Sequence, residues 1–238
     1  MSELNNMVTV VIPVLNEEEA IEQVIRDVKN ADFHNILVVD GYSTDQTYSK
    51  AKNNGVQVVY QEGSGKTGAI ETAINNVETP FLVFMDGDCT YDPQDITKIA
   101  HQLLYSDMII GVRTIGRENI PFLNRFGNWV INFEFNILHG TNLIDVCSGM
   151  YGMRTSFAKN LEFVTSGFDV EVEIASQASK RGVISEIPIH YNARVGQQKL
   201  QPFRDGLQIF YSVIKFAWKN GNLGKMSYHR IPNDPHIK

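Results

Sequence analysis

The chain has 238 residues, of which 43% are hydrophobic and 20% are charged, a balance typical of an ordinary globular domain. This length fits one large α/β domain, alone or with a modest appendage. The net charge of −6 argues against broad nucleic-acid binding, which requires a basic field, so no nucleic-acid partner is expected.

Strand and helix signals alternate over the first half of the chain. Apolar and β-branched runs predict strands at residues 8–15, 36–39, 56–60, 81–85 and 108–112. Helices are predicted between them, at residues 17–29, 45–53, 67–76 and 94–105. Such repeated alternation indicates an α/β fold with a mainly parallel sheet flanked by helices.

The rhythm changes beyond residue 113. The expected elements are an aromatic-rich helix, an extended segment, a helix, a strand and an apolar helix, at residues 122–138, 145–153, 169–180, 183–191 and 207–218. A polar loop is predicted between the last two, and the C-terminal residues are expected to be loosely ordered. The first and last of these helices fit either a core or an amphipathic surface that lies on a membrane.

Export and membrane-insertion signals are missing from the sequence. Cys89 and Cys147 form neither a disulfide framework nor a metal-ligand spacing, which favours a reducing cytoplasm. The first six residues lack the basic start and apolar core of a secretory signal. No run approaches the roughly 20 apolar residues that span a bilayer. Any membrane contact is therefore expected to be peripheral, on the cytoplasmic face.

Two carboxylates one residue apart, Asp86 and Asp88, follow the apolar run at 81–85. Ligands of open α/β sheets bind at the carboxyl ends of the strands. Carboxylate oxygens there can bring Mg²⁺ or Mn²⁺ to a substrate phosphate. Because acidic residues also cap helices and solvate turns, the motif alone leaves both interpretations open.

Other strand ends converge on the same edge of the predicted sheet. Asn16 and Glu17 follow the first strand and Asp40 ends the second. Amide and carboxylate groups can bind a nucleobase or a ribose hydroxyl, although Asn16 and Glu17 also fit a helix N-cap with an acidic first turn. The glycine-rich segment 63–68 is not a Walker A motif, because Tyr60 stands where that motif requires glycine. It can still bind phosphate through backbone N–H groups and Lys66.

The order of these motifs resembles that of inverting family 2 glycosyltransferases with the GT-A fold, and among them the polyprenyl (dolichyl) phosphate hexose synthases. The resemblance covers residues 8 to 206. The matching segments are Val11-Ile12-Pro13-Val14-Leu15-Asn16-Glu17-Glu18, Val38-Val39-Asp40, Lys66-Thr67-Gly68-Ala69, Met85-Asp86-Gly87-Asp88, Ile110-Gly111-Val112-Arg113, Asp145-Val146-Cys147-Ser148-Gly149-Met150 and Arg194-Val195-Gly196-Gln197-Gln198-Lys199-Leu200.

The resemblance implies a GT-A domain over residues 1–206, divided into a nucleotide-sugar-binding half at 7–112 and an acceptor half at 113–206. An amphipathic helix and a polar tail would follow at 207–238. It further implies that Mg²⁺ or Mn²⁺ is held by Asp86 and Asp88. The implied donor-binding residues are Pro13, Asn16, Glu17, Asp40, Lys66 and Asp86.

The resemblance also implies a polyprenyl phosphate acceptor. Catalytic roles would fall to Asp88, Arg113, Asp169, Arg194 and Lys199. The two arginines and the lysine would lie near the phosphates, and the aspartate at 169 is a candidate base. A phosphate monoester has a second pKa near 6 and is already an anion at neutral pH. It can therefore attack the anomeric carbon without a strong protein base. The loop that carries Arg194 and Lys199 also fits an ordinary solvated loop.

The chain departs from the family pattern at three places. The loop Gly196-Gln197-Gln198-Lys199 lacks the serine that often precedes the lysine. Asp40-Gly41-Tyr42-Ser43 replaces the usual Asp-Asp-Gly-Ser, and Thr90, a poor metal ligand, follows the Asp86 and Asp88 pair where a polar ligand is common. The base of the donor and the third metal ligand therefore stay open. UDP-glucose and GDP-mannose both fit as donors, since nothing in the sequence reads the hydroxyl configuration of the sugar.

The prediction is a metal-dependent hexosyltransferase that acts on a polyprenyl phosphate at a membrane surface. A glycosyltransferase acting on a sugar hydroxyl and a non-catalytic nucleotide-sugar-binding protein remain as alternatives. A sugar-nucleotide pyrophosphorylase is disfavoured, because that class requires a glycine- and arginine-rich loop after the first strand.

Overall fold

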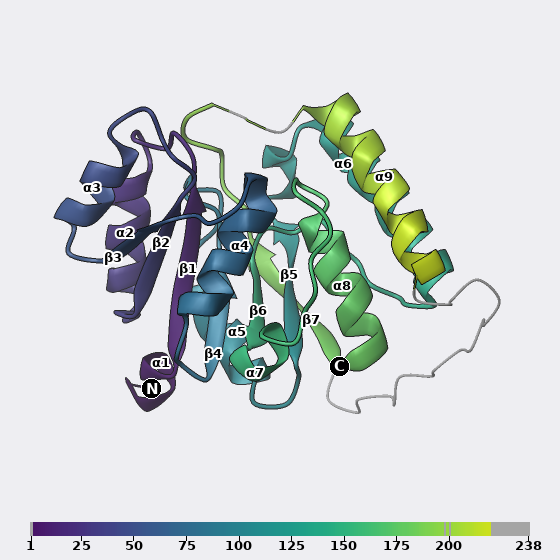
Figure 1. Cartoon of the computed structure of the whole chain (residues 1–238), viewed down its shortest axis with the longest axis horizontal. Coiled ribbons are helices and arrows are strands. Elements are labelled where there is room, and N and C mark those ends of the chain that lie inside the picture. The colour runs from purple at the N-terminus through teal and green to yellow at the C-terminus, as the bar shows by residue number, and fades with distance from the viewer. Residues whose placement is uncertain (1, 198, 200, 220–238) are drawn as a thin grey trace.

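The structure, a computed structural model of the whole chain, describes residues 2–197, 199 and 201–219. Within these residues, seven strands form one sheet in the order β3-β2-β1-β4-β6-β5-β7 (Figure 1). β6 pairs antiparallel with β4 and β5, and the other neighbours pair parallel. The strands are β1 (Val8–Val14), β2 (Ile36–Asp40), β3 (Gln57–Tyr60), β4 (Phe81–Phe84), β5 (Met108–Ile115), β6 (Tyr151–Arg154) and β7 (Ile184–His190).

Helices cover both faces of the sheet. α1 (Ser2–Asn6), α2 (Ile21–Asn30), α3 (Thr47–Asn53) and α5 (Asp95–Gln102) pack on one face. α4 (Gly65–Asn76), α7 (Thr155–Ala158) and α8 (Val170–Arg181) pack on the other. α2 illustrates the cause, because its Ile21, Val24, Ile25 and Val28 recur at helical spacing and are buried. The predicted α/β fold with a mainly parallel sheet is confirmed.

A third layer lies outside α8. It consists of α6 (Phe122–His139), which follows the short 3₁₀ turn η1 (Arg117–Asn119), and α9 (Pro202–Lys219). The two helices lie side by side (Figure 1) and share a core with α8 that includes Phe135, Val172 and Phe216. Among the described residues, none of the helices is long and apolar enough to cross a bilayer.

Three predicted boundaries differ from the structure by four residues or more. α2 begins at Ile21 with Ala20 as its N-cap, so the interpretation of Asn16 and Glu17 as the cap and first turn of this helix is wrong. A separate turn intervenes, in which the backbone N–H groups of Ala20 and Ile21 donate to the Glu17 carbonyl. The segment predicted as extended at 145–153 is a strand only from Tyr151.

α9 begins at Pro202 rather than at 207. The carboxylate of Asp205 accepts a hydrogen bond from the Gln201 backbone N–H at 2.7 Å, a favourable placement for an acidic side chain at a helix start. The predicted polar loop is correspondingly shorter. The expectation of a loosely ordered tail concerns residues 220–238, which lie outside the described residues.

Candidate active site

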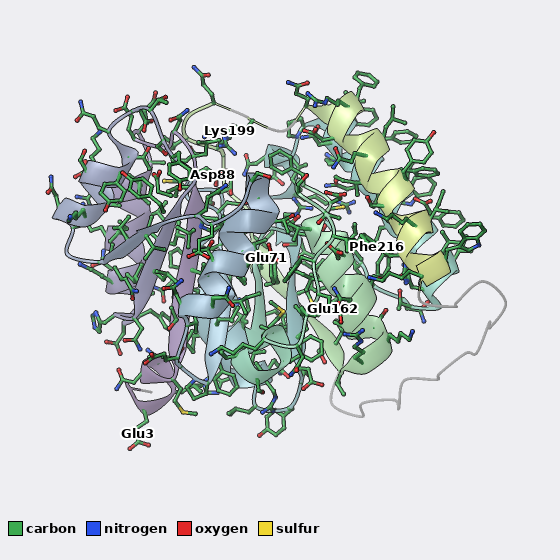
Figure 2. All side chains as sticks on the ribbon, viewed as in Figure 1. Glu3, Glu71, Asp88, Glu162, Lys199 and Phe216 are labelled. Atoms are coloured by element: carbon green, nitrogen blue, oxygen red, sulfur yellow. The ribbon has the colours of Figure 1, made fainter. Side chains whose placement is uncertain are left out.

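The carboxyl ends of the parallel strands open on a cavity of about 890 Å³. Segments that follow β1, β2 and β4 form one end of it, and side chains from α4, α6, α8 and α9 line the rest. Figure 2 shows Asp88 and Lys199 at this end of the sheet, whereas Glu3 lies at the opposite end. The parallel sheet thus gathers polar groups from distant parts of the sequence at one edge.

Asp86 is held by a partly buried ammonium group. The Nζ atom of Lys66 lies 3.1 Å from Oδ1 of Asp86 and 2.6 Å from Oε1 of Glu171, and all three residues line the cavity. Burial alone would lower the pKa of Lys66, but the charges of Asp86 and Glu171 raise it well above its ordinary value. Lys66 is therefore a fixed positive charge in the cavity wall.

Gly149 gives Asp86 the room it occupies. A Cβ atom at this position would lie 2.3 Å from Oδ2 of Asp86, well inside van der Waals contact. The Gly149 backbone N–H donates to the Tyr91 hydroxyl at 2.8 Å, which fixes the glycine segment against the carboxylate. Only glycine fits beside Asp86 in this arrangement.

Asp88 is almost completely buried, and both of its oxygens have partners. Oδ1 accepts hydrogen bonds from the backbone N–H and the hydroxyl of Thr90, at 3.1 and 2.5 Å. Oδ2 lies 2.5 Å from Nη1 of Arg194, whose Nη2 donates to Oε1 of Glu17 at 2.6 Å. The same Glu17 oxygen also pairs with the ammonium of Lys199. Arg194 thus joins carboxylates that follow two different strands.

Burial makes these carboxylates unusual acids. Desolvation raises the pKa of Asp88, and the nearby charge of Asp86 adds to this effect. Desolvation also raises the pKa of Glu17, although the hydrogen bond from Lys199 and the charge of Arg194 oppose the shift. The two cations therefore favour the ionised form of carboxylates that burial would otherwise neutralise.

Arg113 lines the cavity and is paired with the carboxylate of Asp145. Its Nε and Nη2 atoms donate to Oδ2 and Oδ1 of Asp145 at 2.7 and 2.6 Å, a bidentate pair. The guanidinium also lies 5.5 Å from the centre of the Tyr191 ring, which packs edge-on against Tyr91. Asp145 and the aromatic rings fix the orientation of Arg113.

The end of the cavity beside β1, β2 and β3 is less charged. Pro13, Leu15, Gly41 and Gln61 line it. A Cβ atom at Gly41 would lie 3.1 Å from Oε1 of Gln61, so the glycine leaves room for this amide. The Oδ1 atom of Asp40 accepts from the Ser43 backbone N–H at 2.7 Å, while its Oδ2 is buried without a protein partner. This end offers neutral and acidic hydrogen-bonding groups beside flat apolar surface.

The opposite end of the cavity is apolar. It lies among α6, α8 and α9, and the side chains that line it include Leu123, Phe126, Val130, Phe203, Leu207 and Phe210. A single cavity therefore joins a polar, charged end to an apolar end.

The carboxylates of Asp86 and Asp88 are the hard oxygen ligands that Mg²⁺ and Mn²⁺ prefer. In the part of the chain that the structure describes, no group of three or more His, Cys, Asp or Glu side chains is arranged to hold a metal ion. Mg²⁺ is commonly bound by one or two carboxylates together with substrate phosphates and water. The two aspartates fit a divalent cation that arrives with a phosphate-bearing ligand.

The family model for glycosyl transferase family 2 matches residues 9–161, a segment that contains Asp86, Asp88 and Arg113. The chain belongs to glycosyl transferase family 2. The resemblance stated from the motifs is thereby confirmed, and the chain is a glycosyltransferase.

Two archaeal members of the family illustrate the relationship. The glycosyltransferase AglJ of Haloferax volcanii is 35% identical over 223 residues, which cover 91% of this chain and 74% of that protein. A dolichyl-phosphate hexose transferase of the same organism is 33% identical over 211 residues, which cover 87% of this chain and 92% of that protein. Both relatives align with nearly the whole of this family 2 glycosyltransferase.

Solved structures agree on the fold. The glucosyl-3-phosphoglycerate synthase of Mycobacterium tuberculosis, in complex with phosphoglyceric acid, superposes with a TM-score of 0.73 over 92% of this chain and 82% of that one, at 20% identity. The same enzyme in complex with Mn²⁺, uridine diphosphate and glucosyl-3-phosphoglycerate superposes with a TM-score of 0.71. The GT-A fold expected from the sequence is thus confirmed.

The cavity of this family 2 glycosyltransferase collects most of the residues predicted from sequence. Those that line it are Pro13, Glu17, Lys66, Asp86, Asp88, Arg113, Arg194 and Lys199. Asp40 precedes Gly41 in the sequence but is fully buried and does not line the cavity. Their individual roles remain predictions.

Two predicted residues have other partners. The Oδ1 atom of Asn16 accepts from the Thr44 backbone N–H at 2.8 Å, on the exposed side of the loop after β1. Asp169 is buried against α9, where its carboxylate accepts from Ser212 Oγ at 2.7 Å and from Gln208 Nε2 at 3.2 Å. This arrangement favours a role for Asp169 in joining α8 to α9 over a role as a base.

Three residues of the site were not singled out from sequence as site residues. Glu171 lies in the first turn of α8 and pairs with Lys66. Gln61 and Tyr91 line the cavity, and nothing in their local sequence marks them. Gln61 directly follows β3, and this position is the signal that could have indicated it. Tyr91 lies well beyond the end of β4 at Phe84, so strand position does not indicate it.

Proposed function

We propose that this glycosyltransferase moves a hexose from a nucleotide-sugar, UDP-glucose or GDP-mannose, to a polyprenyl or dolichyl phosphate, with inversion at the anomeric carbon. Mg²⁺ or Mn²⁺ would be held by Asp86 and Asp88 together with the donor diphosphate. The observation that carries the proposal is the continuous cavity, which joins a charged end at the sheet edge to an apolar end among α6, α8 and α9.

The donor would occupy the polar end. Pro13, Leu15, Gly41 and Gln61 provide flat apolar and amide surface for a nucleoside, and Asp40 supplies an unpartnered carboxylate oxygen beside it. The diphosphate would then reach Lys66 and the two aspartates. A divalent cation there neutralises the charge that develops on the departing nucleoside diphosphate. The Mn²⁺ and uridine diphosphate bound by glucosyl-3-phosphoglycerate synthase support this chemistry.

The acceptor would occupy the apolar end. Its isoprenoid chain matches the aliphatic and aromatic lining contributed by α6 and α9, and its phosphate would approach Arg113, Arg194 and Lys199. These cations offset the repulsion between two anionic substrates. Because the phosphate is itself an anionic nucleophile, the arrangement needs no strong protein base. The relationship to a dolichyl-phosphate hexose transferase supports this acceptor class.

The proposal is tested by incubating the protein with polyprenyl phosphate, Mg²⁺ or Mn²⁺ and a panel of labelled nucleotide-sugars. We expect label from one donor to enter the organic phase, and we expect Asp88→Asn to abolish the transfer. Donor hydrolysis without organic-phase label would move the acceptor to a sugar or a protein. No reaction with any donor would leave a nucleotide-sugar-binding protein as the better interpretation.

A further inference from the structure

Both oxygens of the Asp88 carboxylate are already in use. Thr90 donates twice to Oδ1, through its backbone N–H at 3.1 Å and its hydroxyl at 2.5 Å. Oδ2 is therefore the oxygen left for a cation, and Nη1 of Arg194 lies 2.5 Å from it. A divalent cation bound to this oxygen would lie beside the Arg194 guanidinium. The two positive charges repel each other, so the cation and the guanidinium compete for this oxygen.

The backbone around Arg194 is attached to the segment that carries Asp88. The Asn192 N–H donates to the Thr90 carbonyl at 2.7 Å, and the Val195 N–H donates to the Asp88 carbonyl at 2.9 Å. These bonds flank Arg194 on both sides. The guanidinium can therefore leave Asp88 by a side-chain movement, while its Cα stays beside the site.

Glu17 can hold the guanidinium after it leaves Asp88. Its Oε1 already accepts from Nη2 of Arg194 at 2.6 Å. Its Oε2 is buried and has no hydrogen-bond partner, and Glu17 as a whole is only 7% exposed. An unpaired carboxylate oxygen in such a place is costly. It becomes satisfied if the N–H group released from Asp88 turns to it.

We infer that Arg194 is a positioning residue. Its guanidinium binds Asp88 in the protein without ligands and moves away from Asp88 when a divalent cation binds together with the nucleoside diphosphate. Its guanidinium then stays on Glu17 and faces the phosphates. When the cation binds alone, the Arg194 guanidinium loses its contact with Asp88 and gains no new anionic partner. When a diphosphate binds as well, it provides the freed guanidinium with a second anion. Cation and nucleotide therefore bind cooperatively. The inference rests on the proposed binding of a nucleotide-sugar at this site.

The test measures Mn²⁺ binding to the full chain by electron paramagnetic resonance, without nucleotide and then with UDP or GDP. Wild-type protein should bind Mn²⁺ weakly alone. Arg194→Gln should bind Mn²⁺ alone about tenfold more tightly, within the range of ordinary coupling between sites. The factor by which nucleotide increases the Mn²⁺ affinity should be smaller in this variant than in wild type, by a similar amount.

Two further variants separate competition for Asp88 from a general change of charge. Lys199→Gln removes a cation that touches Glu17 but not Asp88, so it should raise the Mn²⁺ affinity less than Arg194→Gln does. Arg194→Lys keeps the charge but lacks the planar fork that spans both carboxylates. It should also bind Mn²⁺ more tightly than wild type, which provides a second measurement if Arg194→Gln does not fold.

Equal Mn²⁺ affinity of wild type, Arg194→Gln and Arg194→Lys in the absence of nucleotide would overturn the inference. An equal rise of the Mn²⁺ affinity in Arg194→Gln and Lys199→Gln would also overturn it, because the effect would then be explained by the lost positive charge alone. Neither readout involves hexose or lipid. If wild-type protein transfers no hexose to polyprenyl phosphate but the variants differ in Mn²⁺ affinity as expected, the result counts against the proposed function alone.

Discussion

Single side chains in the cavity are arranged as oppositely charged neighbours. Lys66 faces Asp86 and Glu171, Arg113 faces Asp145, and Arg194 faces Asp88. Isolated charges at such depth are costly, whereas pairs with good geometry offset most of the desolvation. The cavity can thus present several cations to anionic substrates without leaving any of these three uncompensated before the substrates arrive.

The Arg113 and Asp145 pair gives a stability prediction. Both side chains are about nine-tenths buried, at 8% and 12% exposure. Asp145→Asn removes the counter-charge and should lower the free energy of unfolding by about 3 kcal/mol, because it leaves a buried cation unpaired. Urea unfolding measures the change. The double variant Arg113→Met, Asp145→Leu should recover much of the loss, and an equally unstable double variant would contradict this explanation.

Gly149 gives an activity prediction. Gly149→Ala places a Cβ atom 2.3 Å from Oδ2 of Asp86, so the carboxylate must move and hexose transfer should fall at least tenfold. Gly152→Ala is the matched control, because its Cβ meets Ile99 in the hydrophobic core instead, at 2.5 Å. The control should lower the melting temperature but reduce hexose transfer less than Gly149→Ala does. The reverse ranking would show that Gly149 matters only for packing.

The sequence indicated the residues that follow strands, and it could not indicate those that depend on tertiary pairing. Asp86 and Asp88 come directly after an apolar run, so their place at the sheet edge followed from the strand itself. Glu171 lies far from Lys66 in the sequence, and only the packing of α8 beside α4 brings them together. The same limit applies to Asp169, whose partners lie on α9.

At the scale of elements, periodicity identified nearly all helices and strands but not the way they stack. The antiparallel insertion of β6 between β4 and β5 leaves no mark in the sequence, because four residues of buried strand look alike in either direction. The packing of α6 against α9 was also open, since both fitted a core or a surface. The structure gives each helix one buried side and one exposed apolar side.

Glu134 on α6 gives a pH prediction for this helix layer. Both of its carboxylate oxygens are buried without a partner among the described residues, and burial raises its pKa to about 7. The folded state therefore holds a proton that the unfolded chain releases near pH 4.5. The stability that Glu134 contributes is complete below that pH and is lost as the pH rises toward and past 7.

Glu134→Gln should accordingly raise the free energy of unfolding at pH 8 by roughly 1 to 2 kcal/mol, allowing for the partial exposure of the side chain. At pH 4.5 the same variant should be close to wild type. Urea unfolding at the two pH values measures the difference. If the difference in stability between the variant and wild type is the same at both pH values, Glu134 does not titrate in the folded protein.

At the scale of the whole molecule, α6 and α9 form an outer apolar face. The exposed side chains of α6 are apolar throughout, and α9 repeats the pattern at helical spacing. This face comprises Phe122, Leu123, Phe126, Trp129, Phe133 and Ile137 of α6 with Phe203, Leu207, Tyr211, Ile214 and Trp218 of α9. Phe126 and Phe203 also line the cavity, so the face is continuous with its apolar end.

The charge of the two helices favours an anionic bilayer as the partner of this face. The chain carries a net charge of −6, yet α6 and α9 contain four basic and two acidic residues. Arg204, Lys215 and Lys219 are exposed along α9 beside the apolar stripe. Aromatic side chains flanked by basic ones are typical of helices that lie in a membrane interface. Under the proposed function, such docking would place the mouth of the cavity where a polyprenyl phosphate resides.

Membrane docking is tested by sedimentation with vesicles that contain anionic phospholipid. Wild-type protein should co-sediment, and the double variant Trp129→Ser, Phe133→Ser should lose at least tenfold in vesicle affinity, because each buried aromatic contributes about 1.5–3 kcal/mol. Raised salt should weaken binding further, since each basic residue near the surface adds about 1 kcal/mol. Tyr105→Ser is the control, because that side chain is 78% exposed but lies outside both helices, in the turn between α5 and β5. If wild type stays in the supernatant while transfer to polyprenyl phosphate proceeds, the acceptor reaches the cavity without docking, and the apolar face must serve another partner.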